Sequence, residues 1–180
     1  MRIFFACLLV TVAHAEVKID LHDLPGTNGE WQEGVAIIPA PPDQIRAWLT
    51  DYPNWPKRFP DIGWSTVLPD DAKGRHVVRF SSHIVDAIIT VHEAVTPNLL
   101  VFEGTAPYTH TQGRIHLIDR GDGTTKVLMQ STAEVHGFYK IFATKRLKRD
   151  LGFEVSRSHL RALYELATKG DRAFDMSRGR

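Results

Sequence analysis

The sequence predicts an α+β fold: a curved antiparallel sheet, with two short helices after its first strand and a long C-terminal helix packed across it. Three observations lead to this prediction: a segment rich in proline and tryptophan, a run of strand-like segments after it, and a helical pattern at the end. The 180 residues, 43% of them hydrophobic, suffice for one domain with a sizeable core.

The proline-rich segment, residues 39–62, holds six of the ten prolines and two of the four tryptophans. It follows a strand predicted over 31–38. Pro41 and Pro42 suit the first positions of a helix, where no backbone N–H is needed. Pro53 ends this helix, because a residue before proline avoids the α region. A second very short helix follows, and we expect the tryptophans to anchor both helices on the sheet as a corner.

The middle of the chain is typical of an antiparallel meander, in which short strands alternate with turns. The Asp-Gly pair at 122–123 is a strong hairpin signal between two of the strands. The predicted strands cover residues 63–69, 75–82, 87–96, 98–106, 110–119 and 124–136.

Residues 138–170 are predicted to form one long helix that ends at Gly170. Apolar and small side chains recur along it at steps of three or four, which gives the helix one inward face. No other segment could cover the apolar face of the sheet. The expected inward stripe comprises Leu147, Leu151, Val155, Ser158, Ala162 and Leu166.

The first 15 residues are typical of a secretory signal peptide. Arg2 precedes an apolar run, and Ala13-His14-Ala15 fits a cleavage site; a buried N-terminal helix or strand is the alternative. Cleavage near Ala15 would give a periplasmic or secreted protein. The expected organisation is a signal peptide at 1–15, an extension at 16–30, the domain at 31–169 and a flexible tail at 170–180.

Cleavage would also remove Cys7, the only cysteine, which excludes disulfides and thiol chemistry in the mature protein. Loss of Arg2 lowers the number of Lys and Arg from 22 to 21, equal to the 21 Asp and Glu. A net charge of zero argues against a nucleic-acid partner.

The entry "IPAPPDQIRAWLTD", the corner "DYPNWPKRFP" and the long last helix together resemble the START-like helix-grip (SRPBCC) superfamily. Within it the chain is most similar to the polyketide cyclase/dehydrase and coenzyme Q-binding START family, over about residues 31–169. The resemblance implies a sheet that curls around the helix and leaves an apolar cavity. It implies no particular chemistry, because the superfamily includes lipid carriers, quinone binders, cyclases and regulators.

The cavity is expected beside Ser158 and Ala162, where small side chains interrupt the helix stripe. A core filled by Trp48, Trp55, Phe59 or Phe102 is the alternative. The predicted ligand-binding residues are Val91, Glu93, Val101, Glu103, Ile115, Leu117, Val127, Met129, Ala133, Leu151, Val155, Ser158 and Ala162.

Glu93 and Glu103 each share a strand face with apolar residues. A buried carboxylate is costly unless it is paired, and its pKa often rises. Either residue could therefore bind a ligand hydroxyl or act as an acid or base. Ion pairs with Arg79 or Arg114, or a position at a wet strand end, are the alternative.

No metal site is predicted, because the histidines lack the converging spacing of zinc ligands. No catalytic residue is predicted either. Ser81, Ser82, His83 and Asp86 include the residue types of a hydrolytic triad, but no nucleophile-elbow pattern surrounds the serines. A polar turn is the simpler interpretation.

Five basic residues cluster near the start of the predicted long helix. Such a cluster could attract anionic lipid headgroups, and a solvated helix face paired with nearby acids is the alternative. The cluster comprises Lys140, Lys145, Arg146, Lys148 and Arg149.

We therefore expect a monomer that sequesters an apolar small molecule, such as a lipid, isoprenoid or quinone, without a cofactor. It could also contact an anionic membrane surface transiently. An enzyme on the same fold, a cyclase, dehydrase or hydrolase with a cavity carboxylate or histidine, is the main alternative, and an interaction module with a filled core is another. A polar pair with perturbed pKa values inside the cavity would favour the enzyme.

Overall fold

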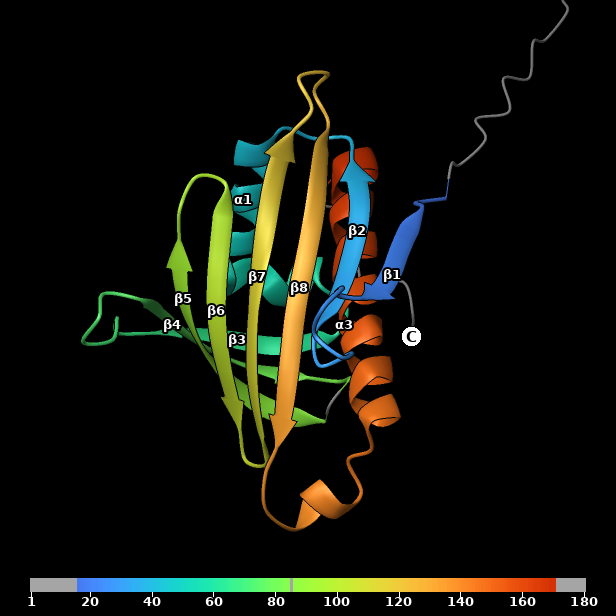
Figure 1. Ribbon diagram of the computed structural model, residues 1–180. Coiled ribbons are helices and arrows are strands. Elements are labelled where there is room, and N and C mark those ends of the chain that lie inside the picture. Colours follow the sequence, from blue (N-terminus) through green and yellow to red (C-terminus); the bar gives the residue numbers. More distant parts are fainter. Residues whose placement is uncertain (1–15, 85, 171–180) are drawn as a thin grey trace, which may run out of the picture.

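The computed structural model describes residues 16–84 and 86–170 (Figure 1). The signal peptide predicted over 1–15 and residues 171–180 of the predicted tail lie outside the described residues. The strands are β1 (Ile19–Asp23), β2 (Gln32–Ile38), β3 (Ile62–Leu68), β4 (His76–Ser82), β5 (Ala87–Val95), β6 (Leu99–Ala106), β7 (Thr109–Asp119) and β8 (Thr125–Val135). The α-helices are α1 (Pro42–Thr50), α2 (Trp55–Arg58) and α3 (Lys145–Lys169), with 3-10 turns η1 (Tyr52–Asn54) and η2 (Gly137–Ile141).

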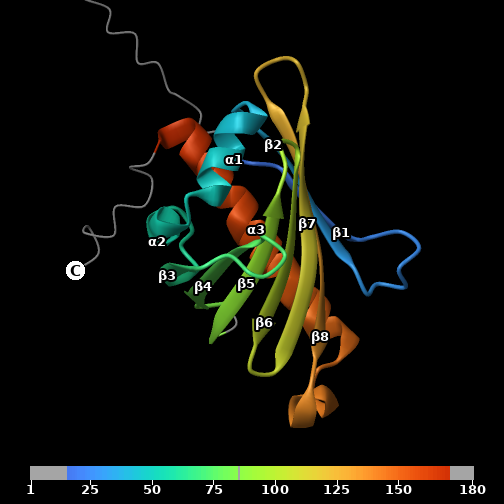
Figure 2. The ribbon, with the colours of Figure 1, turned by 90° about the vertical axis from the view of Figure 1, so that its left-hand side faces the viewer.

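All eight strands form one antiparallel sheet in the order β1-β2-β8-β7-β6-β5-β4-β3. The meander from β3 to β8 pairs sequence neighbours, and β2 then pairs with β8, so an early and a late strand of the domain lie side by side, one strand in from the β1 edge of the sheet. The sheet curves, and α3 runs across its concave face (Figures 1 and 2). The predicted α+β helix-grip architecture is therefore confirmed.

The proline-rich corner carries the chain from β2 to β3, at the far edge of the sheet. Pro42 occupies the first helical turn of α1, as predicted, and Ile45, Trp48 and Leu49 are its buried residues. Trp55 donates its indole N–H to the carbonyl oxygen of Leu49 over 3.0 Å, which joins α2 to α1. The corner is thus a packed unit, because a hydrogen bond joins its two helices and its apolar side chains are buried together.

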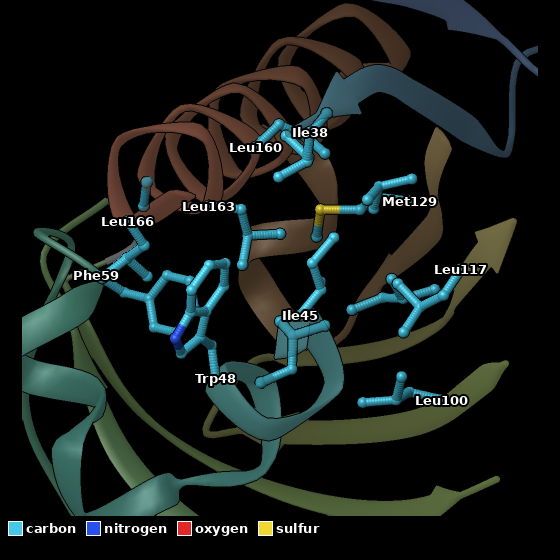
Figure 3. Close-up of a cluster of buried hydrophobic side chains, with 14 of the residues drawn as sticks. Ile38, Ile45, Trp48, Phe59, Leu100, Leu117, Met129, Leu160, Leu163 and Leu166 are labelled. Carbon is cyan, nitrogen blue, oxygen red and sulfur yellow. The ribbon is translucent and has the colours of Figure 1, made fainter. Parts of the chain in front are cut away.

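One half of the space under α3 is a filled core. Leu163 and Leu166 of α3 lie near Trp48 and Phe59 of the corner, whereas Leu160 lies beside Ile38 of β2 (Figure 3). Buried side chains of β6, β7 and β8 complete this cluster. Each of the three leucines is at most 2% exposed. This half of the molecule supplies the apolar burial that stabilises the fold.

The structure differs from the prediction at the start of the long helix. Helix α3 begins at Lys145, because the side chain of Thr144 accepts a hydrogen bond from the backbone N–H of Leu147 and caps it. The helix predicted from residue 138 is therefore wrong over its first turns, where η2 stands instead. In the predicted extension at 16–30, β1 adds an edge strand to the sheet.

Candidate functional site

The other half of the space under α3 is a pocket of about 220 Å³, lined mostly by apolar side chains. It lies between the first half of α3 and the concave faces of β4 to β8, beside the corner. Trp55, Phe59 and Phe102 form part of its wall without filling it. The cavity predicted between sheet and helix is thus present, although its position along α3 differs.

Glycine residues set the geometry of this pocket. A Cβ atom on Gly152 of α3 would lie 2.8 Å from Oε1 of Gln32, and one on Gly34 would lie 2.9 Å from Cβ of Ser156. These small residues let α3 approach β2 closely on one side. On the other side the ring of Phe102 lies over Gly113 of β7, where a Cβ would come within 2.3 Å of it. The ring therefore lies against the sheet and leaves space below the helix.

Seven of the predicted binding residues line the pocket. They come from β5, β7, β8 and the first half of α3, so segments far apart in the sequence meet here. They are Val91, Glu93, Ile115, Met129, Ala133, Leu151 and Val155.

The other predicted residues lie elsewhere. Leu117 and Val127 are fully buried in the core beyond the pocket. Val101 and Glu103 are on the outer face of β6, since Leu100 and Phe102 are the residues of that strand that point inward. Their expected place in the cavity wall is wrong, because strand residues alternate between faces and the opposite set is concave.

Ser158 and Ala162 are also wrong as pocket residues. Ala162 is 1% exposed and belongs to the core, and Ser158 donates its hydroxyl to Oδ1 of Asp61 over 3.1 Å. The pocket face of α3 continues from Val155 to His159, a step of four, and not to Ser158. The small-residue gap predicted beside Ser158 and Ala162 is therefore filled by protein.

Glu93 carries a carboxyl group into the inner part of the pocket, where it is 4% exposed. The phenol of Tyr52 donates to its Oε2 over 2.6 Å, and this hydrogen bond replaces the expected arginine partner. Burial raises the pKa of Glu93 to about 7, although the Tyr52 hydrogen bond and the nearby His76 oppose this shift. Burial also raises the pKa of Tyr52, with Glu93 as the next cause. Near neutral pH this carboxyl can therefore gain or lose a proton.

Asp61 and His159 form a second polar pair on the pocket wall. Oδ2 of Asp61 lies 3.3 Å from Nε2 of His159, close enough for an ion pair when the imidazole is protonated. Burial alone would raise the pKa of Asp61, but His159 and the Ser158 hydroxyl outweigh it and lower that pKa. Asp61 thus stays ionised beside His159 on the pocket wall.

Glu103 is part of a polar network on the outer face of the sheet. Its Oε2 accepts from Nη1 of Arg75 over 2.9 Å, and its Oε1 lies 3.3 Å from Nε2 of His110. Arg75 also binds Asp71, which pairs with His92. Glu103 therefore forms an ion pair, as in the alternative interpretation, but its partner is Arg75 and not Arg79 or Arg114.

The serines near the end of β4 have separate environments. Ser82 is buried on the pocket wall, whereas the hydroxyl of Ser81 accepts a hydrogen bond from the backbone N–H of Trp64. The backbone N–H of His83 donates to the carbonyl oxygen of Asp61 in a turn. Within residues 16–84 and 86–170, no group of three His, Cys, Asp or Glu side chains could hold a metal ion.

The pocket opens at the end where β8 finishes and α3 begins. Its lining residues there, Ala106, Thr109, Val135 and Leu151, are all partly or well exposed, whereas Ile62 and Met129 farther in are buried. Lys148 also lines this end. We call this opening the mouth.

Comparison with known families agrees with the family resemblance found in the sequence. Residues 33–165 match the family described as polyketide cyclase / dehydrase and lipid transport. The chain belongs to this family. No curated protein matches it individually.

Solved structures share the fold of this polyketide cyclase/dehydrase and lipid transport family member at low sequence identity. A START superfamily protein from Mycobacterium smegmatis is 14% identical with a TM-score of 0.67, over 77% of this chain and 97% of that one. The Zhui aromatase/cyclase from a Streptomyces species is 17% identical with a TM-score of 0.62, over 84% and 95%. A STAR-related lipid transfer protein from Xanthomonas axonopodis is 14% identical with a TM-score of 0.60, over 86% and 94%.

Sequence patterns missed both residues of the Asp61–His159 pair on this family member's pocket wall, and also Tyr52, the partner of Glu93 behind that wall. Tyr52 and Asp61 lie in the proline-rich corner, where no periodicity shows which side chains turn inward. The only sequence signal for His159 was its spacing of four residues from Val155, which places both on one side of the helix. A histidine at such a position is equally typical of a solvated helix face.

Proposed function

We propose that this protein binds and carries an apolar small molecule, such as a lipid, isoprenoid or quinone, in the pocket between α3 and the sheet. The supporting observation is the pocket itself, which is lined mainly by apolar side chains and open at one end. Each CH₂ group that leaves water on entry contributes about 0.8 kcal/mol. Sequestration alone therefore gives useful affinity, without any covalent step.

The size of the pocket favours a slim ligand. A cavity of about 150 Å³ holds a benzene ring, so the volume of about 220 Å³ suits one substituted ring or a short single chain. A longer chain would extend through the mouth. A phospholipid with two acyl chains exceeds this space.

Glu93 favours a ligand with a polar group at its inner end. Glu93 lies opposite Phe102 of β6 in the sheet. Phe102 is four residues from Ala106 at the mouth, so Glu93 lies about 13 Å inside the pocket, measured along the strand. A protonated Glu93 can both donate and accept a hydrogen bond. The ligand would place a hydroxyl or carbonyl there and its apolar part toward the mouth.

An enzyme is the second candidate, favoured by two polar pairs, Tyr52–Glu93 and Asp61–His159, in which Glu93, Asp61 and His159 line the pocket. Both pairs contain groups with shifted pKa values, which a pure carrier does not need. In this case Glu93 or His159 would transfer a proton to or from a bound substrate.

Native mass spectrometry of the protein from a periplasmic or secreted fraction tests the carrier and the export proposal together. We expect a chain that starts near Glu16, because cleavage near Ala15 would remove the apolar leader, with one small apolar molecule bound. Glu93→Gln and His159→Asn should retain the same molecule if the protein is a carrier. A different mass bound to these variants than to wild type would identify a substrate and favour the enzyme. An intact chain from Met1 would reject export.

Ala133→Phe should weaken binding of a neutral naphthylamine dye at least tenfold, because the new ring would occupy the ligand space beside β8. The matched control is Ala94→Phe, which adds the same ring on the exposed outer face of β5. Dye titration and thermal unfolding of both variants provide the comparison. Equal dye binding by Ala133→Phe and wild type, or no binding by wild type, would contradict the carrier proposal.

A further inference from the structure

The most exposed large hydrophobic side chains of the described residues gather at one end of the molecule. Phe138 is 70%, Ile141 75% and Phe142 60% exposed, on η2 and the residue after it. Leu147 and Leu151 of α3, at 48% and 36%, continue this surface toward the pocket. In Figure 2, η2 projects beyond the foot of β8, away from the rest of the domain.

The same segment is strongly basic. Residues 137–149 contain five Lys and Arg and no Asp or Glu, although the whole chain is almost neutral. Arg146 and Arg149 lie 3.7 Å from Asp150 and Asp23, at the edge of the segment, so these two charges are partly compensated.

The lysines of the segment keep their charge available. Lys140 and Lys148 form no ion pair within the described part of the chain, and Lys145 donates to the backbone carbonyl of Asn28, which carries no net charge. The alternative interpretation of this cluster was a solvated helix face whose basic residues pair with nearby acids. It therefore holds for the two arginines and not for the three lysines. We call the five hydrophobic side chains and these three lysines the tip.

We propose that the tip docks on an anionic lipid bilayer, with Phe138, Ile141 and Phe142 in the interface and the lysines against the headgroups. An apolar face beside clustered Lys and Arg is the pattern of a segment that lies in the membrane interface. Each Lys near an anionic surface strengthens binding about fivefold. A bilayer fits better than a protein partner, since η2 is a narrow projection and not a broad surface, and the segment around it contains cations and no acid.

The mouth of the pocket opens onto this surface, because Lys148 and Leu151 belong to both. Given the proposed carrier function, docking would join the pocket to the bilayer, so that a ligand could pass between them without crossing water. Within the described residues, no helix is long and apolar enough to span a membrane, and the proposal concerns a surface contact alone.

Flotation with lipid vesicles tests this proposal on the protein that begins at Glu16, which retains every helix and strand described. Wild type should float with vesicles of phosphatidylcholine containing 30% phosphatidylglycerol and weakly with phosphatidylcholine alone, and binding should fall as salt rises. Phe138→Ser/Phe142→Ser should lower binding at least tenfold. Lys140→Glu/Lys145→Glu should lower it at least about 25-fold, since two attractions are lost and two repulsions are added.

Matched variants at distant exposed positions are the controls. Ile37→Ser/Val67→Ser removes exposed hydrophobic side chains from β2 and β3, and Lys57→Glu/Lys126→Glu reverses two other charges. Both controls should float as wild type does. Absence of wild-type binding to anionic vesicles at low salt, or equal loss in controls and tip variants, would overturn the proposal.

Two further measurements separate other causes. If the tip variants abolish a dimer seen by sedimentation while wild type ignores vesicles, the tip contacts a second copy and the proposal is wrong. Dye binding by Phe138→Ser/Phe142→Ser should equal that of wild type, because neither side chain lines the pocket. If wild type binds no dye, the carrier function is rejected, whereas membrane docking is still decided by the flotation result.

Discussion

Trp48→Ala should lower the free energy of unfolding by about 3–5 kcal/mol. The indole is only 9% exposed and lies in the core between the corner and α3 (Figure 3). Truncation would remove a large apolar side chain from the side of α1 that carries Ile45 and Leu49. The surrounding rings and strands are joined by hydrogen bonds and could collapse into the space only in part. Urea unfolding followed by far-UV circular dichroism measures the loss.

Trp64→Ala is the matched control, because it deletes the same side chain at an exposed position on β3. Its cost should be within about 1 kcal/mol of zero. Similar losses in the two variants would mean that general effects of tryptophan removal dominate. A near-neutral Trp48→Ala would contradict the packing of the corner described above.

Glu93→Gln should remove a pH dependence worth about 3 kcal/mol from the stability of the protein. The pKa of Glu93 is raised from 4.5 to about 7 by burial, so between these pH values the folded state holds a proton that the unfolded chain has released. The free energy of unfolding therefore falls as pH rises through this window and levels off above pH 7. The difference in stability between Glu93→Gln and wild type should grow by this amount from pH 4.5 to pH 8.

Glu103→Gln is the control for this measurement. The hydrogen bond from Arg75 is the largest cause that lowers the pKa of Glu103, so its contribution is lost only as the pH falls below the ordinary range of a glutamate. The difference between Glu103→Gln and wild type should therefore stay constant from pH 5 to pH 8. An unchanged pH slope in Glu93→Gln would show that Glu93 ionises normally in the folded protein.

The architecture was predictable from the sequence because its signals are local. Prolines at the first turn of α1, turn residues between strands and the apolar spacing along α3 each depend on a few neighbouring residues. The start of α3 was missed since Thr144 interrupts a segment whose apolar pattern continues upstream, and only the cap geometry decides where the helix begins.

The pocket was predictable only in part, because a strand can present either of two faces and a helix can rotate. The concave faces were assigned correctly for Val91 on β5 and Met129 on β8, and incorrectly for Val101 on β6. The partner of Glu93 was not predictable at all. Tyr52 lies 41 residues away in a corner without periodicity, and only the folded chain brings the two side chains together.

The pairing of β2 with β8 has a consequence for the order in which the protein is assembled. The hairpins from β3 to β8 join neighbours and close short loops, whereas Gln32 must find Ser131 across most of the length of the domain. Such non-local pairing slows folding, because the entropy of closing the loop is lost before the contacts form. Helix α3, which follows every described strand in the chain, rests on this same β2 through Gly152 and Ser156. A nascent chain therefore has no enclosed pocket until α3 has been synthesised and β2 has paired with β8.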